Sequence, residues 1–373
     1  IQELDIKNFC LVGDYKLAWK GALRDAEWPE GPHLYKKDGW YYIMHAEGGT
    51  GPAHAVCVAR SKEVFGPYVG NFNNPIFTHR HLGKAYPVRY VGHADLVDTP
   101  EGDWYMIMLA SRPCEGYTGM GRETFLAKVT WEDGWPVVNE GSGKLADIQE
   151  VDLLVEDALP ESDFYTFHNR TLDPHFVTVR NPKEDMYSLT RQAGKLALKA
   201  APEVITEPTN ASYLGVRQRS YHYTAETRME FVPAAGEEAG LVILQSERAS
   251  VRFVVTQENG KSALCVVSYG DRLNGGRMQE DATENSVVLA KILLPQDSAG
   301  ITLKIMQEGQ QLSFWYAPQD KGFTKLPATV DARFLSTEAA GGFVGNTIGM
   351  YASANHAESE NYALFDYFVV TDL

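Results

Sequence analysis

An internal repeat constrains the fold of this chain more than any other feature of its sequence. The aromatic run Trp40-Tyr41-Tyr42-Ile43-Met44 recurs as Trp104-Tyr105-Met106-Ile107-Met108, at an interval of about 64 residues. Each copy follows a turn with glycine and an acidic residue, and each has a histidine segment before it and a strand-like run after it (Gly31-Pro32-His33 and residues 54–61; Gly92-His93-Ala94 and residues 123–130). Units of three or four antiparallel strands repeating in this way are typical of propeller blades.

The repeat does not fill a closed propeller. Blade-like sequence ends near residue 150, which leaves room for fewer than three copies, whereas closed propellers usually have about four to eight blades. The first residues, IQELDIKNFCLVG, resemble neither a signal peptide nor a capped start. We therefore predict that residues 1–150 form an incomplete β-propeller; the alternative is that the two similar copies arose by chance.

The second part of the chain has a different pattern. Residues 146–162 are acidic and end in Pro-Glu-Ser, as expected of a linker. Alternating apolar runs separated by turn residues follow, among them residues 224–232, 251–256, 301–306 and 362–370. This pattern predicts a β-sandwich over residues 151–373, with the last run bound into a sheet. Convincing helical periodicity is absent, so the predicted fold class is all-β.

Charge and composition exclude several partners. The formal net charge of -15 would repel a phosphate backbone, so we expect no nucleic acid partner. No run of about 18 apolar residues occurs, so we expect no spanning helix and no membrane partner. The four cysteines are far apart, and Cys57 and Cys265 lie in apolar runs. We interpret all four as buried free thiols, which favour a reducing compartment such as the cytoplasm.

Glu30 is the strongest candidate for acid chemistry. It lies between Pro29 and Pro32, next to aromatic residues and before an apolar run. Desolvation there would raise its pKa, and a carboxylic acid that stays protonated near neutral pH can protonate a leaving oxygen. The alternative is an exposed glutamate in a turn.

Other candidates also have two interpretations each. His93 could bind an ion or a water at a propeller hub, or be a core histidine with both nitrogens satisfied. Arg122 could bind sugar hydroxyls or a carboxylate with its forked guanidinium, or pair on the surface with Glu123 or another acid. Asp366, an acid in an apolar strand, could ligate calcium, or be an edge or paired carboxylate. The glycine-rich residues 47–52 lack the lysine and helix of a phosphate cradle and predict a tight turn.

These segments together resemble glycoside hydrolase family 43, in its β-xylosidase and α-L-arabinofuranosidase branch. In the first half, the resemblance is carried by residues 30–36, 45–52 with His54-Ala55-Val56, 92–94 and 121–124. In the second half, it is carried by residues 172–174, 341–345, 350–353 and 365–368, which resemble the concanavalin-like sandwich of those enzymes.

The resemblance implies a five-bladed propeller followed by a jelly-roll sandwich, and hydrolysis with inversion at the anomeric carbon. Such enzymes use a general base, a tuning aspartate and a general acid, and only the acid has a matching position here, Glu30. The resemblance further implies that Arg122 holds the terminal sugar, that His93 is the hub histidine and that Thr50 lies near the acid. Phe343 matches the sandwich residue that closes the sugar pocket.

Two classes of function remain open from the sequence. The first is an exo-acting enzyme that releases xylose or arabinofuranose from xylan-derived oligosaccharides and needs N-terminal blades from a second polypeptide. The second is a non-catalytic carbohydrate-binding or structural remnant. No cofactor is required by either, apart from the calcium considered at Asp366. Homo-oligomerisation and the choice between the two pentoses stay open.

Overall fold

The computed structural model describes residues 1–23, 27–151, 153, 162–270, 286–295, 300–318 and 321–373. Their regular secondary structure is almost entirely β-strand, and they divide into two compact units. Unit 1 comprises residues 1–113 and 122–154, and unit 2 comprises residues 114–121 and 155–373. The domain boundary at residue 150 stays a prediction. Residues 114–121 belong to unit 2 although the segments before and after them belong to unit 1. No pattern in the sequence predicts this grouping.

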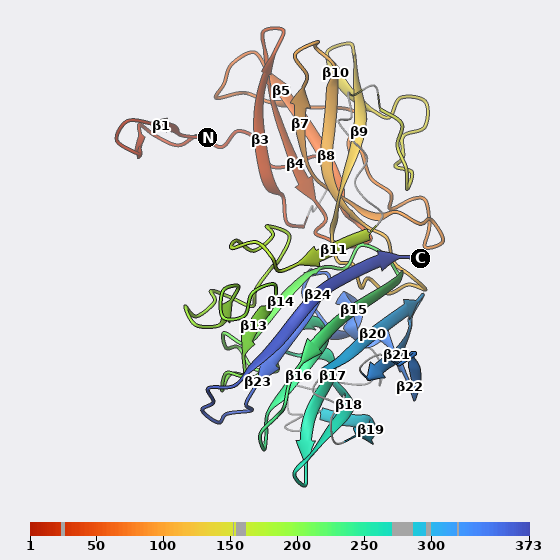
Figure 1. The fold of residues 1–373 in the computed structure, drawn as a ribbon. Helices are drawn as coiled ribbons and strands as arrows, with labels where there is room; N and C mark the ends of the chain where they lie inside the picture. Colours follow the sequence, from red (N-terminus) through yellow and green to blue (C-terminus); the bar gives the residue numbers. More distant parts are fainter. Residues whose placement is uncertain (24–26, 152, 154–161, 271–285, 296–299, 319–320) are drawn as a thin grey trace. The chain divides into compact units, whose positions relative to one another are not determined.

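Unit 1 contains two four-stranded antiparallel sheets, each with its strands in sequence order (Figure 1). The first sheet is β3-β4-β5-β6, with bounds Glu30–Lys37, Trp40–Glu47, Ala55–Ser61 and Val69–Gly70. The second sheet is β7-β8-β9-β10, with bounds Arg89–Asp98, Trp104–Ser111, Glu123–Glu132 and Trp135–Val138. Such meanders are propeller blades, and they confirm the interpretation of the repeat.

The repeat reflects the position of the second strand in each blade. Strands β4 and β8 have neighbours on both sides, and Tyr42, Met44, Met106 and Met108 on them are buried in one apolar cluster. A strand in this position needs apolar side chains, which explains why both copies share the pattern. The chain also begins with a small hairpin in unit 1, formed by β1 (Glu3–Asp5) and β2 (Cys10–Val12).

Unit 2 is a sandwich of two antiparallel sheets (Figure 1). One sheet has six strands in the order β14-β23-β16-β17-β18-β19, with bounds Ser212–Arg217, Thr347–Ser353, Glu238–Ser246, Ala249–Glu258, Lys261–Tyr269 and Ser286–Leu293. The other runs β12-β13-β24-β15-β20-β21-β22, with bounds Tyr187–Ser188, Leu196–Lys199, Tyr362–Asp372, His222–Glu230, Gly300–Glu308, Gln311–Pro318 and Thr324–Asp331. Strand β11 (Ser162–Thr166) pairs with β24.

Alternating side chains from the two sheets meet in a large apolar core. Phe253 on β17 and Phe314 on β21 are fully buried there, with ring centroids 5.4 Å apart in an edge-to-face arrangement. The last strand, β24, pairs with β11, β13 and β15, so the predicted attachment of the final apolar run is confirmed. The predicted linker at residues 146–162 lies mostly outside the described residues.

The stretch 114–121 is bound to unit 2 by specific hydrogen bonds. The carboxylate of Glu338, in α1 (Thr337–Ala340), accepts from the Thr118 amide at 2.6 Å and from its hydroxyl at 2.7 Å. The Tyr221 hydroxyl accepts from the Gly119 amide at 2.9 Å. A β-carbon at Gly345 would lie 2.2 Å from the Met120 carbonyl oxygen, so only glycine allows this approach. These contacts explain why the eight residues group with the sandwich.

All four cysteines are free thiols, as predicted, but the expected burial of all four is wrong. Cys57 and Cys265 are buried, Cys114 is half-buried and Cys10 is exposed. Location in a reducing compartment stays a prediction. Within the described ranges, none of the helices has the length and apolar character needed to cross a bilayer.

Candidate active site

Glu30 opens the first strand of the first blade. Strand β3 pairs with β4, and the register shifts between Glu30 and His33, where Gly31 adopts a left-handed φ of 57°. Such bulges often redirect a side chain beside a functional site. The Glu30 side chain is 47% exposed, so the described residues do not bury it as the sequence analysis expects. Exposure alone does not decide between a catalytic acid and an exposed glutamate, so the neighbours of Glu30 are described next.

A buried carboxylate holds the segment that leads into Glu30. Glu47, at the end of β4, accepts hydrogen bonds from the Ala22 amide (2.7 Å), the Leu23 amide (3.0 Å) and His45 Nε2 (2.7 Å). Burial alone would raise the pKa of Glu47, but these hydrogen bonds outweigh burial and hold its pKa below the usual range. Glu47 is therefore a structural anion that fixes the approach to the candidate acid.

His93 faces Glu30. His93 Nδ1 lies 3.6 Å from Glu30 Oε1, and the imidazole is 38% exposed. A β-carbon at Gly31 would lie 2.5 Å from His93 Nε2, so the imidazole occupies space that any other residue at position 31 would fill. His93 is consequently not a core histidine with both nitrogens satisfied. Glu30 and His93 come from separate motifs of the sequence, and the structure brings the two side chains together.

A hydrogen bond between Arg122 and Thr50 is a second side-chain contact in unit 1. Arg122 Nη1 donates to Thr50 Oγ1 at 3.4 Å. Glu123 is bound by Arg112, whose Nη2 lies 2.7 Å from its Oε1. Next to Thr50, a β-carbon at Gly49 would lie 2.6 Å from the Trp28 ring. The Thr50 loop therefore packs against the segment that carries Glu30.

His54 lies among these groups. It is fully buried, and the charges of His93, Glu30 and Arg122 all act on its imidazole. Its Nδ1 lies 2.9 Å from the Tyr90 carbonyl oxygen. His54 is part of a family motif, but no role was predicted for it. Its place in that motif, beside the glycine-rich turn, is the sequence signal that could have pointed to it.

Phe343 and Asp366 belong to unit 2. Phe343 is 50% exposed in the glycine-rich loop after α1. Asp366, on β24, pairs with two cations: Lys195 Nζ lies 2.8 Å from Oδ1, and Arg228 Nε lies 3.2 Å from Oδ2. Asp366 is thus a paired carboxylate, which was the alternative to a calcium ligand. Over the described ranges, no group of three or more His, Cys, Asp or Glu side chains could hold a metal ion, and calcium here has no structural support.

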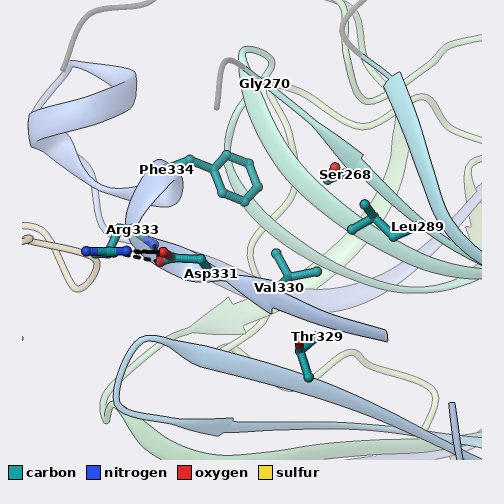
Figure 2. A pocket seen from close by; sticks show the side chains of 8 residues that line it. All are labelled: Ser268, Gly270, Leu289, Thr329, Val330, Asp331, Arg333 and Phe334. Carbon is teal, nitrogen blue, oxygen red and sulfur yellow. Dashed lines mark hydrogen bonds and ion pairs between the residues drawn. The ribbon is translucent and has the colours of Figure 1, made fainter. Parts of the chain in front are cut away.

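A pocket of about 450 Å³ opens in the sandwich between the ends of β18 and β19 and strand β22 (Figure 2). Leu289, Val330 and Phe334 give it an apolar wall. Its two charged residues bind each other, since Arg333 Nε donates to Asp331 Oδ2 at 2.8 Å. Because both charges are paired, the pocket offers no group suited to acid–base chemistry.

The buried histidines of unit 1 predict a pH dependence of stability. Burial lowers the pKa of both His54 and His79 in the folded state, while the unfolded chain keeps the ordinary value of about 6.5. The unfolded state therefore binds more protons below about pH 6.5, and stability falls with acidification by at most about 1.4 kcal/mol per pH unit for each histidine. Above that pH the contribution is fully present.

Chemical denaturation at pH 7.5 and pH 5.5, followed by tryptophan fluorescence, measures this effect, because six of the seven tryptophans lie in unit 1 (Trp19, Trp28, Trp40, Trp104, Trp131 and Trp135). We expect lower stability at pH 5.5 and a flatter dependence in His79→Phe. Equal stability of the wild type at the two pH values would contradict the prediction.

Comparisons with known proteins identify the chain. Residues 1–136 match the model of glycosyl hydrolases family 43, and residues 165–371 match the β-xylosidase C-terminal concanavalin A-like domain. The chain belongs to glycosyl hydrolase family 43. It is a glycosidase of that family, and its fold combines propeller blades with a concanavalin-like sandwich, as predicted.

Three family 43 proteins illustrate the similarity. A xylosidase/arabinosidase of Butyrivibrio fibrisolvens is 45% identical over the whole chain, which covers 70% of that protein. A non-reducing end alpha-L-arabinofuranosidase of Bacteroides ovatus is 34% identical over 91% of the chain and 62% of its own length. The crystal structure of a xylan beta-1,4-xylosidase from Bacillus halodurans matches with a TM-score of 0.88 and 31% identity over 100% of this chain and 70% of its own.

Proposed function

We propose that this chain carries the acid half of an inverting, exo-acting glycosidase that releases terminal xylose or arabinofuranose from xylan-derived oligosaccharides. The observation that supports this best is the contact of His93 with Glu30 at the start of β3, in a chain of family 43. In this proposal Glu30 protonates the glycosidic oxygen as it leaves. Inversion in one displacement also needs a carboxylate base on the opposite face of the sugar, about 6.5–9.5 Å from the acid.

The other residues of the cluster suit sugar binding. Arg122 presents a fork of donors to sugar hydroxyls, and Thr50, already bound to it, adds a hydroxyl. Trp28 is 63% exposed beside Glu30 and offers an apolar ring face of the kind on which a pyranose can pack. A site with one acid, one arginine and one aromatic face suits the removal of a single terminal sugar.

The choice of pentose follows the relatives only in part. One named relative is a xylosidase/arabinosidase, one an arabinofuranosidase and one a xylosidase. The two sugars are isomeric pentoses that differ in ring size and in the exocyclic hydroxymethyl group of the furanose, and a difference of one such group in a pocket gives about 1–3 kcal/mol of discrimination. We therefore propose that both terminal pentoses are substrates.

Time courses with xylobiose and with arabinoxylan oligosaccharides test this function. We expect monosaccharide from the first time point, and each longer oligosaccharide should be shortened by one sugar at a time. Release of oligosaccharides from inside a chain would contradict the exo mode, and binding without any product would favour the non-catalytic alternative.

The base is proposed to come from further propeller blades. Unit 1 holds two blades, below the usual range of about four to eight. The separate polypeptide predicted from the sequence has no support in the comparisons, because the Butyrivibrio relative carries its further 30% in one chain. Intact mass analysis of the native protein decides the matter: a companion of roughly 150–190 residues would support two polypeptides, and a single longer chain would replace that reading.

Phe343→Ala should weaken sugar binding and leave stability nearly unchanged. The side chain is half exposed, so truncation should change the free energy of unfolding by no more than about 0.5 kcal/mol. The family resemblance implies that Phe343 closes the sugar pocket, and loss of that apolar contact should raise KM by about 5- to 30-fold. Phe323→Ala, which truncates another exposed phenylalanine of the sandwich, is the matched control and should leave KM unchanged. A loss confined to the melting temperature of Phe343→Ala would refute the role.

A further inference from the structure

The strand that carries His93 is strained at this point. The pairing of β7 with β8 shifts register twice, between Arg89 and Gly92 and between Gly92 and Asp95. Within this bulge, Tyr90 and His93 both adopt left-handed backbone conformations, with φ of 61° and 50°. A non-glycine residue in that region costs about 1–3 kcal/mol and persists only where its surroundings determine it. Something must therefore hold the bulge.

His54 contacts the bulge at two places. Its Nδ1 lies 2.9 Å from the carbonyl oxygen of Tyr90, the first strained residue, and donates to it. Its ring lies on Gly92, next to the second strained residue, since a β-carbon there would be 2.5 Å from three ring atoms. His54 is fully buried, and its Nε2 has no hydrogen-bond partner among the residues that the structure describes. These contacts bracket the turn that directs His93.

We propose that His54 is a positioning residue: it clamps the bulge of β7 and so holds the His93 imidazole against the Glu30 carboxylate. The chain of contacts runs from His54 to Tyr90 and Gly92, through the backbone to His93, and from His93 to Gly31 and Glu30. The proposal rests on the proposed function, because it assigns His54 to the acid side of that reaction. A displacement of about 1 Å at such a site can cost about 100-fold in rate.

His79 provides a matched control. It is also a buried histidine of unit 1, with Nδ1 2.7 Å from the Val88 carbonyl oxygen, but its Nε2 accepts from the Leu145 amide at 2.9 Å. Its two nitrogens are thus satisfied. Its hydrogen bonds to the described residues go to Val88 and Leu145, and not to Gly92 or His93. Replacing His79 should cost stability without a specific effect on acid catalysis.

The experiment compares two substrates in the active enzyme, meaning this chain together with its further blades. Xylobiose needs protonation of its leaving oxygen, whereas an aryl xyloside with an acidic phenol scarcely does. In His54→Phe we expect kcat/KM for xylobiose to fall about 10- to 100-fold more than for the aryl xyloside. His54→Asn, whose amide can still donate to Tyr90, should recover part of that loss. His79→Phe should affect both substrates equally.

Equal losses on the two substrates in His54→Phe would overturn the proposal. If that variant fails to fold, Gly92→Ala gives a second test, because its methyl group displaces the His54 ring; an unchanged substrate ratio there would also overturn it. Glu30→Gln separates this proposal from the function itself. If Glu30→Gln loses more activity on xylobiose than on the aryl xyloside but the His54 variants do not, only the role of His54 is refuted. If Glu30→Gln shows no such difference, the assignment of Glu30 as the acid is refuted as well.

Discussion

Glu30→Gln is expected to slow hydrolysis of xylobiose by about 100- to 10,000-fold, the usual contribution of a general acid. Glutamine keeps the size and polarity of the side chain but has no proton to give. Glu30 is 47% exposed and lies 3.6 Å from His93, so the substitution removes no buried contact and should leave the fold intact. Rates on xylobiose and on aryl xylosides with increasingly acidic phenols measure the effect.

The loss in Glu30→Gln should shrink as the leaving group becomes more acidic, because such groups depart without protonation. An unchanged melting temperature is the control for folding. If the variant hydrolyses xylobiose at the wild-type rate, Glu30 is not the acid. If it loses the same factor on every leaving group, Glu30 acts in binding or positioning.

Phe314→Ala should destabilise the sandwich by about 3–5 kcal/mol, the largest stability effect that we expect from one substitution in unit 2. Phe314 is fully buried, packs edge to face on Phe253 and belongs to the core that both sheets share. Truncation removes this aromatic contact and leaves a cavity. Denaturation followed by the fluorescence of Trp315, the one tryptophan of unit 2, measures the change.

Phe323→Ala is again the control, because that ring is 40% exposed and should cost no more than about 0.5 kcal/mol. A loss in Phe314→Ala as small as in Phe323→Ala would show that the core between the two sheets is not packed as described.

Patterns of local origin were predictable from the sequence. The aromatic repeat placed β4 and β8 because a strand with neighbours on both sides must be apolar, and alternation placed β15, β17, β20 and β24 in the sandwich. Glu30, His93, Thr50 and Arg122 came from motifs, and the structure brings His93 to Glu30 and Arg122 to Thr50.

Features that depend on distant contacts were not predictable. His54, just before β5, holds the bulge at Tyr90 and His93. No local sequence pattern predicts that a histidine will adopt a left-handed backbone conformation. The docking of residues 114–121 depends on Tyr221 and Glu338, more than one hundred residues away. Asp366 carried the pattern of an ion ligand, but Lys195 and Arg228 come from other strands or turns and pair with it.

The configuration of the first-formed sugar tests the central claim most directly. If Glu30 acts only as the acid and a separate base activates water on the opposite face, hydrolysis is a single displacement. Proton NMR of the early reaction with a β-xyloside should then show α-xylose first, with the β-anomer appearing later by mutarotation. Initial release of β-xylose would mean a covalent double displacement and would contradict the division of roles proposed for this chain.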